Sequence, residues 1–140
     1  MKAYVDTSVL LRHVLREPEA FEQWDDIEKC CTSELSSVEA LRTFDRLRLE
    51  GKLSDIEVSE KMRLLREAFR TIDFIALNRA VLDRASRAFP TVVATLDAIH
   101  LASASLYVES RKEQLVFLTH DARLAVAAQA LGFDVYPWRV

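Results

Sequence analysis

Four acidic side chains occupy positions from which they could act together as a metal site. Asp6 follows a short apolar run and Asp121 follows another, while Glu39 and Asp97 stand near the starts of helical patterns. Four carboxylates that converge repel one another unless a divalent cation lies between them. Ligation by oxygen alone favours magnesium or manganese over zinc. The acids therefore predict a Mg²⁺ or Mn²⁺ site.

The same positions also suit a purely structural role. Aspartate is a preferred first residue of helices because its carboxylate accepts the free amide hydrogens of the first turn. Residues 36–39, Ser-Ser-Val-Glu, match a capping box that would give Glu39 a local partner. Asp6 fits this role least well, because Ser8 is available to cap the same helix. Spacing alone leaves the metal site and the helix caps both open.

The elements that must position these acids follow from the hydrophobic pattern. We expect strands at residues 3–5, 30–32, 74–77, 115–119 and 133–136, and helices at 8–15, 19–28, 36–49, 54–70, 79–88, 97–109 and 122–131. The strands are too apolar to face water, which indicates a helix-rich α/β fold whose mainly parallel sheet is covered on both sides. Parallel strands would bring at least Asp6 and Asp121 to one edge of that sheet.

Length and composition limit the classes of protein. The chain has 140 residues and a formal net charge of −3, which predicts a single soluble domain over residues 1–140 and argues against indiscriminate nucleic-acid binding. Its only glycines, Gly51 and Gly132, lie far apart, so a dinucleotide fingerprint, a Walker A loop and a nucleophile elbow are all excluded.

The cysteines and the N-terminus predict a cytoplasmic location without a membrane partner. Cys30 and Cys31 are adjacent and would point to opposite faces of a strand, which disfavours a disulfide between them and indicates buried thiols in a reducing compartment. No run approaches the roughly 18 apolar residues of a membrane span. An acid at position 6 is also unlike a signal peptide.

Four segments in order resemble the PIN-domain ribonucleases, particularly the VapC-type toxins of VapBC toxin–antitoxin pairs. They are Tyr-Val-Asp-Thr-Ser-Val-Leu-Leu at 4–11, Ser-Ser-Val-Glu-Ala-Leu-Arg at 36–42, Leu-Asp-Ala-Ile-His-Leu-Ala-Ser-Ala at 96–104, and Leu-Thr-His-Asp at 118–121. The resemblance runs over essentially the whole chain. It implies a three-layer α/β/α sandwich of the PIN type.

The resemblance also implies a Mg²⁺- or Mn²⁺-dependent endoribonuclease. Asp6 and Asp97 would be the strongest metal ligands, with Glu39 and Asp121 completing the catalytic set. The metal would activate a water and neutralise charge on the scissile phosphate. Its expected partners are an RNA substrate, a cognate VapB-type antitoxin and a second copy of the chain in a homodimer.

The residues around these acids receive narrower roles. Under the same resemblance, the hydroxyls of Ser8 and Thr119 would hold the carboxylates by hydrogen bonds. Arg42 and Arg46 extend from Glu39 along one helix, where they form either a surface that follows RNA phosphates or a solvated face with helical ion pairs. His100 is interpreted as a hydrogen-bonded histidine and not as a ligand.

Two further functions compete with the nuclease. One is a catalytically silent PIN-like module that binds RNA or a protein, which the presence of all four acids disfavours. The other is a metal-dependent phosphatase or phosphoacceptor domain. That function calls for Asp-x-Asp after the first strand, where this chain has Asp6-Thr7-Ser8, or for a lysine after the last core strand, where it has His120.

Overall fold

Alternate residues of the central strand divide the protein into two cores. In the computed structural model, which describes residues 1–137, β1 (Lys2–Val5) directs Ala3 and Val5 into one core and Tyr4 into the other. Neighbouring residues of a strand point to opposite faces, so a strand that is apolar throughout has to be covered on both. The two buried clusters provide that cover.

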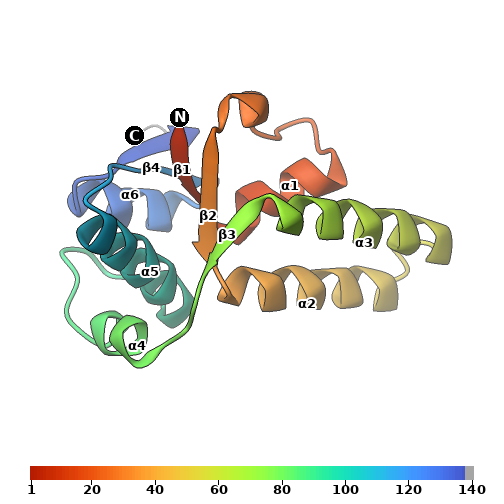
Figure 1. The fold of residues 1–140 in the computed structure, drawn as a ribbon. Helices are drawn as coiled ribbons and strands as arrows, with labels where there is room; N and C mark the ends of the chain where they lie inside the picture. Colours follow the sequence, from red (N-terminus) through yellow and green to blue (C-terminus); the bar gives the residue numbers. More distant parts are fainter. Residues whose placement is uncertain (138–140) are drawn as a thin grey trace.

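The sheet contains five strands, all parallel, in the order β3-β2-β1-β4-β5 (Figure 1). The strands that flank β1 are β2 (Lys29–Ser33) and β4 (Val116–Thr119), and the edge strands are β3 (Ile72–Ile75) and β5 (Asp134–Pro137). The predicted central parallel sheet is therefore confirmed. Its carboxyl edge carries the ends of β1, β2 and β4 side by side.

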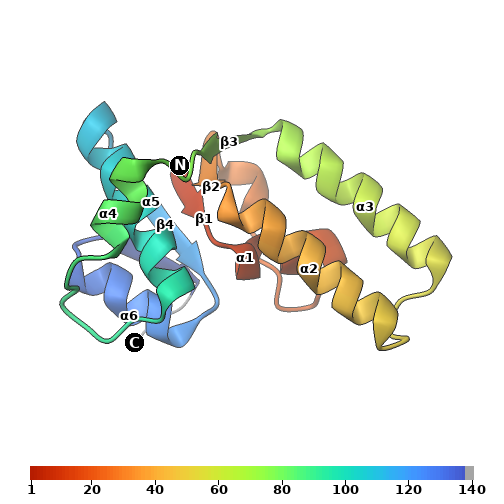
Figure 2. The same cartoon turned by 90° about the horizontal axis from the view of Figure 1, so that it is seen from below.

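Helices cover both faces and complete the predicted three-layer sandwich. The Ala3 face is covered by α1 (Thr7–Leu15), α2 (Leu35–Leu49) and α3 (Asp55–Arg70), and the Tyr4 face by α5 (Thr95–Arg111) and α6 (Ala122–Ala130), with α4 (Arg79–Ala85) packed on α5. The view from below separates these two groups of helices and shows α2 and α3 reaching away from the sheet as an antiparallel pair (Figure 2).

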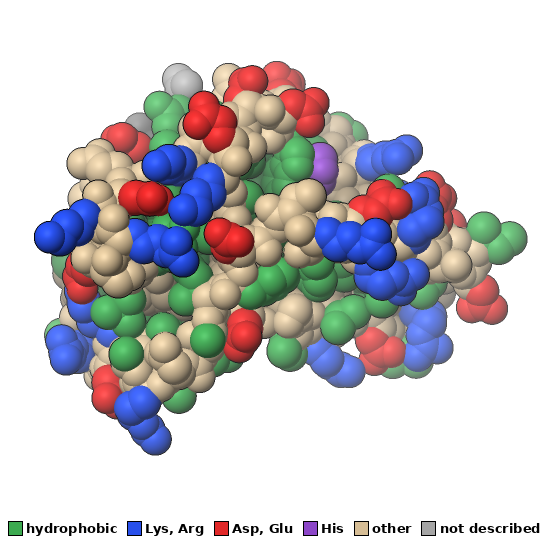
Figure 3. Space-filling view, viewed as in Figure 1, with side chains coloured by type: hydrophobic (Ala, Val, Ile, Leu, Met, Phe, Trp, Pro, Cys, Tyr) green, Lys and Arg blue, Asp and Glu red, His purple; other side chains and the backbone are tan. Residues whose placement is uncertain are grey.

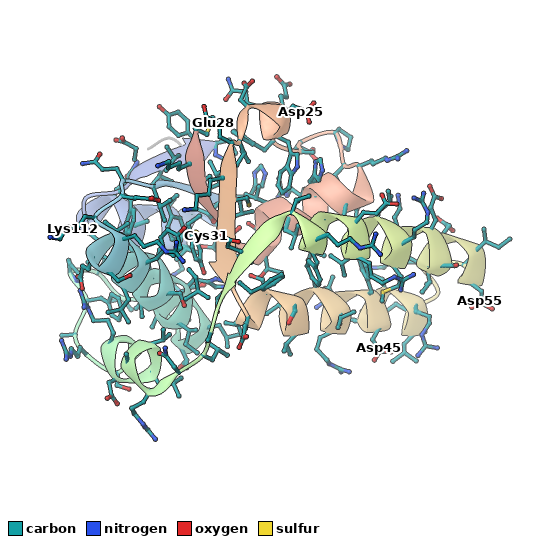
Figure 4. The ribbon with its side chains drawn as sticks, in the orientation of Figure 1. Asp25, Glu28, Cys31, Asp45, Asp55 and Lys112 are labelled. Carbon is teal, nitrogen blue, oxygen red and sulfur yellow. The ribbon has the colours of Figure 1, made fainter. Side chains whose placement is uncertain are left out.

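The predicted helix at residues 19–28 is wrong. This segment is a loop that contains a single 3₁₀ turn, Trp24–Asp26, and Phe21 is its one fully buried side chain. Half of its ten residues are acidic and none is basic, so like charges would face one another at helical spacing without any ion pair. Asp25 and Glu28 from this loop stand at the start of β2, at the opposite end of that strand from α2 (Figure 4).

The third strand begins two residues earlier than predicted. It spans Ile72–Ile75 and pairs Ile72 with Cys30 and Ile75 with Ser33. The apolar pattern concealed this start because Asp73 interrupts it, and β3 is an edge strand on which an exposed aspartate is tolerated. The two cysteines of β2 are free thiols, one in each core.

Within residues 1–137, no helix is both long enough and apolar enough to cross a membrane.

Candidate active site

Asp6 is the most completely held acid at the carboxyl edge. It directly follows β1 and is the N-cap of α1, the residue just before Thr7. Its Oδ1 accepts hydrogen bonds from the Val9 amide at 3.1 Å and the Ser8 hydroxyl at 2.6 Å. Its Oδ2 accepts from the Thr119 hydroxyl at 2.5 Å. Asp6 thus caps α1, the role that its sequence context favours least. Ser8, which was available to cap this helix, donates its hydroxyl to the Asp6 carboxylate instead.

Burial makes the charge of Asp6 unfavourable. The side chain is 3% exposed, and desolvation raises its pKa although Ser8 and Thr119 donate hydrogen bonds that lower it. Thr119 also accepts a hydrogen bond from the Asp121 amide at 2.9 Å, and Ser8 accepts one from the His120 amide at 3.1 Å. The two hydroxyls therefore tie the end of β1 to the segment that follows β4.

Glu39 does not form the predicted capping box. α2 begins at Leu35 after Glu34, so Glu39 lies in the second turn, and the hydroxyl of Ser36 bonds to that of Thr32 instead of capping the helix. Oε1 of Glu39 accepts the Thr7 hydroxyl at 2.7 Å and lies 2.7 Å from Nε2 of His100. The capping-box geometry occurs instead at the start of α3, between Ser54 and Glu57.

The electrostatics of Glu39 differ from those of Asp6. Partial burial raises its pKa, but the hydrogen bonds from His100 and Thr7 outweigh that effect and leave the pKa below its ordinary value. Glu39 is therefore held as a carboxylate.

Asp97 does not cap a helix. α5 begins at Thr95, with Ala94 as the preceding residue, so Asp97 lies inside the first turn instead of opening the helix as predicted. Its carboxylate accepts no hydrogen bond from any residue in the range 1–137. Burial and then the charges of Asp121, Asp6 and Glu39 raise its pKa, against an opposing effect of His100. The four acids therefore share one electrostatic environment.

Asp121 is the most exposed of the four acids. It is the N-cap of α6, the residue just before Ala122, and its Oδ1 accepts a hydrogen bond from the Leu124 amide at 2.9 Å. A carboxylate has about four lone-pair sites, so a cap of this kind leaves the second oxygen available. The capping role and a ligand role are therefore compatible at Asp121. At Asp6 the second oxygen already accepts the Thr119 hydroxyl, and one lone-pair site remains on it.

The donor set fits a hydrated hard cation. Oxygen ligands and mutually repelling carboxylates favour Mg²⁺ or Mn²⁺. Among residues 1–137, no three histidine, cysteine or acidic side chains form a ready-made cage for a metal ion. Magnesium does not require one, because it keeps several waters and binds through one or two carboxylates together with substrate phosphates.

The sequence identifies His100 as a hydrogen-bonded histidine but not the partners that make it part of the site. The ring of His100 is 3% exposed and joins Glu39 to the hydroxyl of Tyr4, which lies 2.6 Å from Nδ1. The apolar pattern around Tyr4 indicates only a core residue. Thr7 lies between Asp6 and Ser8, and its own type and position do not indicate a role in the site. The spacing of Asp97 and His100, three apart on a helix, was the available signal for His100.

Arg42 and Arg46 lie on the outer surface of α2. Arg42 pairs with Asp45 at 3.1 Å and Arg46 with Glu50 at 4.0 Å, and the exposed fractions of the two arginine side chains are 74% and 65%. Basic and acidic side chains alternate in this way over α2 and α3 (Figure 3). The geometry is that of helical ion pairs, and contact with RNA phosphates stays a prediction.

The fold and the acids at the carboxyl edge of the sheet define a class of protein. It is a three-layer α/β/α domain with acidic residues where the parallel strands end. The pattern of the PIN domain family matches residues 3–130. The chain belongs to the PIN-domain family and, within it, to the VapC type, as its four motifs predicted.

Two curated relatives match nearly the whole chain. It is 31% identical over 137 residues to Ribonuclease VapC47 of Mycobacterium tuberculosis (strain CDC 1551 / Oshkosh), covering 93% of this chain and 92% of that protein. It is 31% identical over 144 residues to Ribonuclease VapC46 of M. tuberculosis (strain ATCC 25618 / H37Rv), covering 94% of each.

Two solved structures share the fold. A toxin–antitoxin complex from Klebsiella pneumoniae has a chain that matches with a TM-score of 0.67 at 17% identity, covering 99% of this chain and 100% of that one. PAE2754 from Pyrobaculum aerophilum matches with a TM-score of 0.59 at 18% identity, covering 96% and 83%. At these identities the comparison concerns the fold alone.

Proposed function

We propose that this protein is a Mg²⁺- or Mn²⁺-dependent endoribonuclease that acts as the toxin of a type II toxin–antitoxin pair in the cytoplasm. The observation that carries the proposal is that Asp6, Glu39 and Asp121 lie near Asp97 at the carboxyl edge, where Thr119 links Asp6 to the Asp121 amide. Burial, and then the charges of these three acids, raise the pKa of Asp97. The curated relatives, both ribonucleases by name, supply the substrate class.

The cation would be held by Asp6 and Asp97, with Asp121 and Glu39 at its margin. When bound, a divalent cation lowers the pKa of a water and neutralises charge that develops on the scissile phosphate. The attacking water forms a bond to phosphorus as the bond from phosphorus to O3′ breaks, which leaves a 5′-phosphate and a 3′-hydroxyl.

The protein's own groups manage the proton and the geometry. Glu39 is held as a carboxylate and has the role of orienting the attacking water and accepting its proton. The hydroxyls of Ser8 and Thr119 fix Asp6, because each donates to a different carboxylate oxygen.

The same proposal includes the partners. A cognate VapB-type antitoxin would inhibit the enzyme, in keeping with the VapC relatives and with the toxin–antitoxin complex that shares the fold. A homodimer and a single domain over residues 1–140 belong to the proposal as well.

A catalytically silent PIN-like module that binds RNA or a protein is the second candidate. The observation that favours it is the burial of Asp6, which is 3% exposed and whose pKa is raised by desolvation, so that the charge a cation needs is unfavourable there. A silent module would bind RNA without cleaving it at any concentration of Mg²⁺.

RNA cleavage by the purified protein separates the two. We expect cleavage with Mg²⁺, none with chelator, and a loss of at least about 100-fold in Asp97→Asn, because the variant lacks one charge of the cation site. Cleavage in chelator would contradict the proposed mechanism, as would full activity of Asp97→Asn. RNA binding without cleavage would establish the silent module.

A further inference from the structure

A buried hydrogen-bond chain runs from the core of the sheet to Glu39. The Tyr4 hydroxyl, from β1, lies 2.6 Å from Nδ1 of His100, and Nε2 of His100, from α5, lies 2.7 Å from Oε1 of Glu39 on α2. Tyr4 is 0% exposed and His100 3%. The His100 ring thus links three elements that are distant in sequence, β1, α5 and α2.

The chemistry of the two ends determines where the hydrogens lie. An ionised carboxylate only accepts hydrogen bonds, so Nε2 of His100 carries the hydrogen that points at Glu39. Burial raises the pKa of Tyr4 well above its ordinary value, so its hydroxyl keeps its proton. In a neutral ring that carries its hydrogen on Nε2, Nδ1 is the acceptor, and the Tyr4 hydroxyl then donates to it. Tyr4 thereby selects the ring form that can donate to Glu39.

The hydrogen-bond chain gives the two carboxylate oxygens of Glu39 different partners. Oε1 receives both the His100 ring and the Thr7 hydroxyl, each at 2.7 Å. No side chain or amide in the range 1–137 donates to Oε2. One oxygen of Glu39 is therefore fixed by the fold, while the other is free to meet water.

We propose that His100, held by Tyr4, is a positioning residue that fixes Glu39 through Oε1 and so presents Oε2 to the attacking water. This inference rests on the proposed ribonuclease function. Without the ring, the flexible side chain of Glu39 can occupy more rotamers, and Oε2 is then less often in the position that meets the water. Removing an outer partner of this kind typically lowers activity 10- to 100-fold.

Three variants and one control test the inference through steady-state RNA cleavage. His100→Leu removes the donor, His100→Gln keeps an N–H donor, and Tyr4→Phe removes a single hydroxyl. The control, Ser103→Ala, alters a buried polar residue of the same helix whose hydroxyl bonds only within α5, to the Ile99 carbonyl.

We expect His100→Leu to lower kcat by about 10- to 100-fold with KM nearly unchanged, and His100→Gln to recover most of that loss. Tyr4→Phe should lose less, about threefold to tenfold, because the ring can still donate but is no longer held in one form. Ser103→Ala should match the wild type. A wild-type kcat in His100→Leu, or equal losses in His100→Leu and His100→Gln, would overturn the positioning role.

A readout without RNA keeps the inference separate from the proposed function. Nitrogen-15 NMR of the imidazole rings distinguishes the two neutral forms, and the spectrum of His100→Gln identifies His100 among the three histidines. We expect the Nε2–H form in the wild type and a mixture in Tyr4→Phe. An Nδ1–H ring in the wild type would overturn the inference. If the wild type cleaves no RNA, the proposed function fails while the spectrum still decides the hydrogen-bond chain.

Discussion

Acidic side chains have cationic partners at the amino edge of the sheet, where the strands begin, and acidic neighbours at the carboxyl edge, where the strands end. At the amino edge, Glu113 lies between Lys2 at 3.7 Å and Lys29 at 3.4 Å, and these cations hold its pKa below the ordinary value against partial desolvation. At the carboxyl edge, desolvation and neighbouring acids raise the pKa of Asp97. The amino edge is neutralised by the protein itself.

The difference indicates which edge needs a bound cation to neutralise its acids. Acids with cationic partners stabilise the fold slightly, and they need no bound cation to neutralise them. Acids gathered without such partners destabilise it until a cation binds. Variants that replace an acid by its amide at each edge therefore test whether the two edges differ in this way.

The largest expected effect is on catalysis, in Asp6→Asn against Glu113→Gln. Asparagine caps helices as well as aspartate does, so the variant should fold, but it lacks the charge that holds the cation. We expect RNA cleavage to fall at least about 100-fold in Asp6→Asn and to stay unchanged in Glu113→Gln. Similar losses in both variants, measured under single-turnover conditions with Mg²⁺, would erase the distinction between the edges.

A smaller effect is expected on stability without metal. The pKa of Asp97 is raised, so the wild type loses stability as the pH rises through that value, whereas Asp97→Asn carries no such charge. In chelator at neutral pH, we expect the variant to melt on the order of 1 to 3 °C higher, a modest gain because the group is partly exposed. The gain should vanish below the ordinary pKa of aspartate. A lower melting temperature for Asp97→Asn at neutral pH would contradict the repulsion.

The smallest effect belongs to the amino edge, and its sign is reversed. The pKa of Glu113 is lowered, so its contribution to stability is present above the ordinary pKa of glutamate and is lost as the pH falls through the lowered value. Glu113→Gln should melt slightly lower than the wild type at neutral pH, and high salt should shrink the gap. A gap that persists unchanged in about 1 M salt would show that something other than charge is lost.

Much of the fold follows from local pattern. The strand that ends before Asp6 is apolar at residues 3–5 and the strand that ends at Thr119 is apolar at residues 116–118, and such runs indicate a parallel sheet with helices on both faces. The carboxyl edge then follows from topology. These features were predictable because each depends on residues that are close in sequence.

The rest depends on contacts that local pattern does not contain. His100 meets Glu39 across 61 positions and Tyr4 across 96, so neither partner could be inferred from the motif around it. Ser36 and Glu39 have the spacing of a capping box, yet both side chains contact the hydroxyl of Thr7, which is far away in sequence, and do not form the cap. The acidic loop at residues 19–28 lacks the cations that a helix there would need.

Direct measurement of Mg²⁺ binding tests whether the acids of the carboxyl edge form one cation site. Isothermal titration of the wild type, Glu113→Gln and Asp97→Asn would compare the two edges in a single experiment. The account predicts saturable binding of Mg²⁺ to the wild type and to Glu113→Gln, with the binding strongly weakened in Asp97→Asn. Equal binding by all three proteins, or none by the wild type, would contradict it.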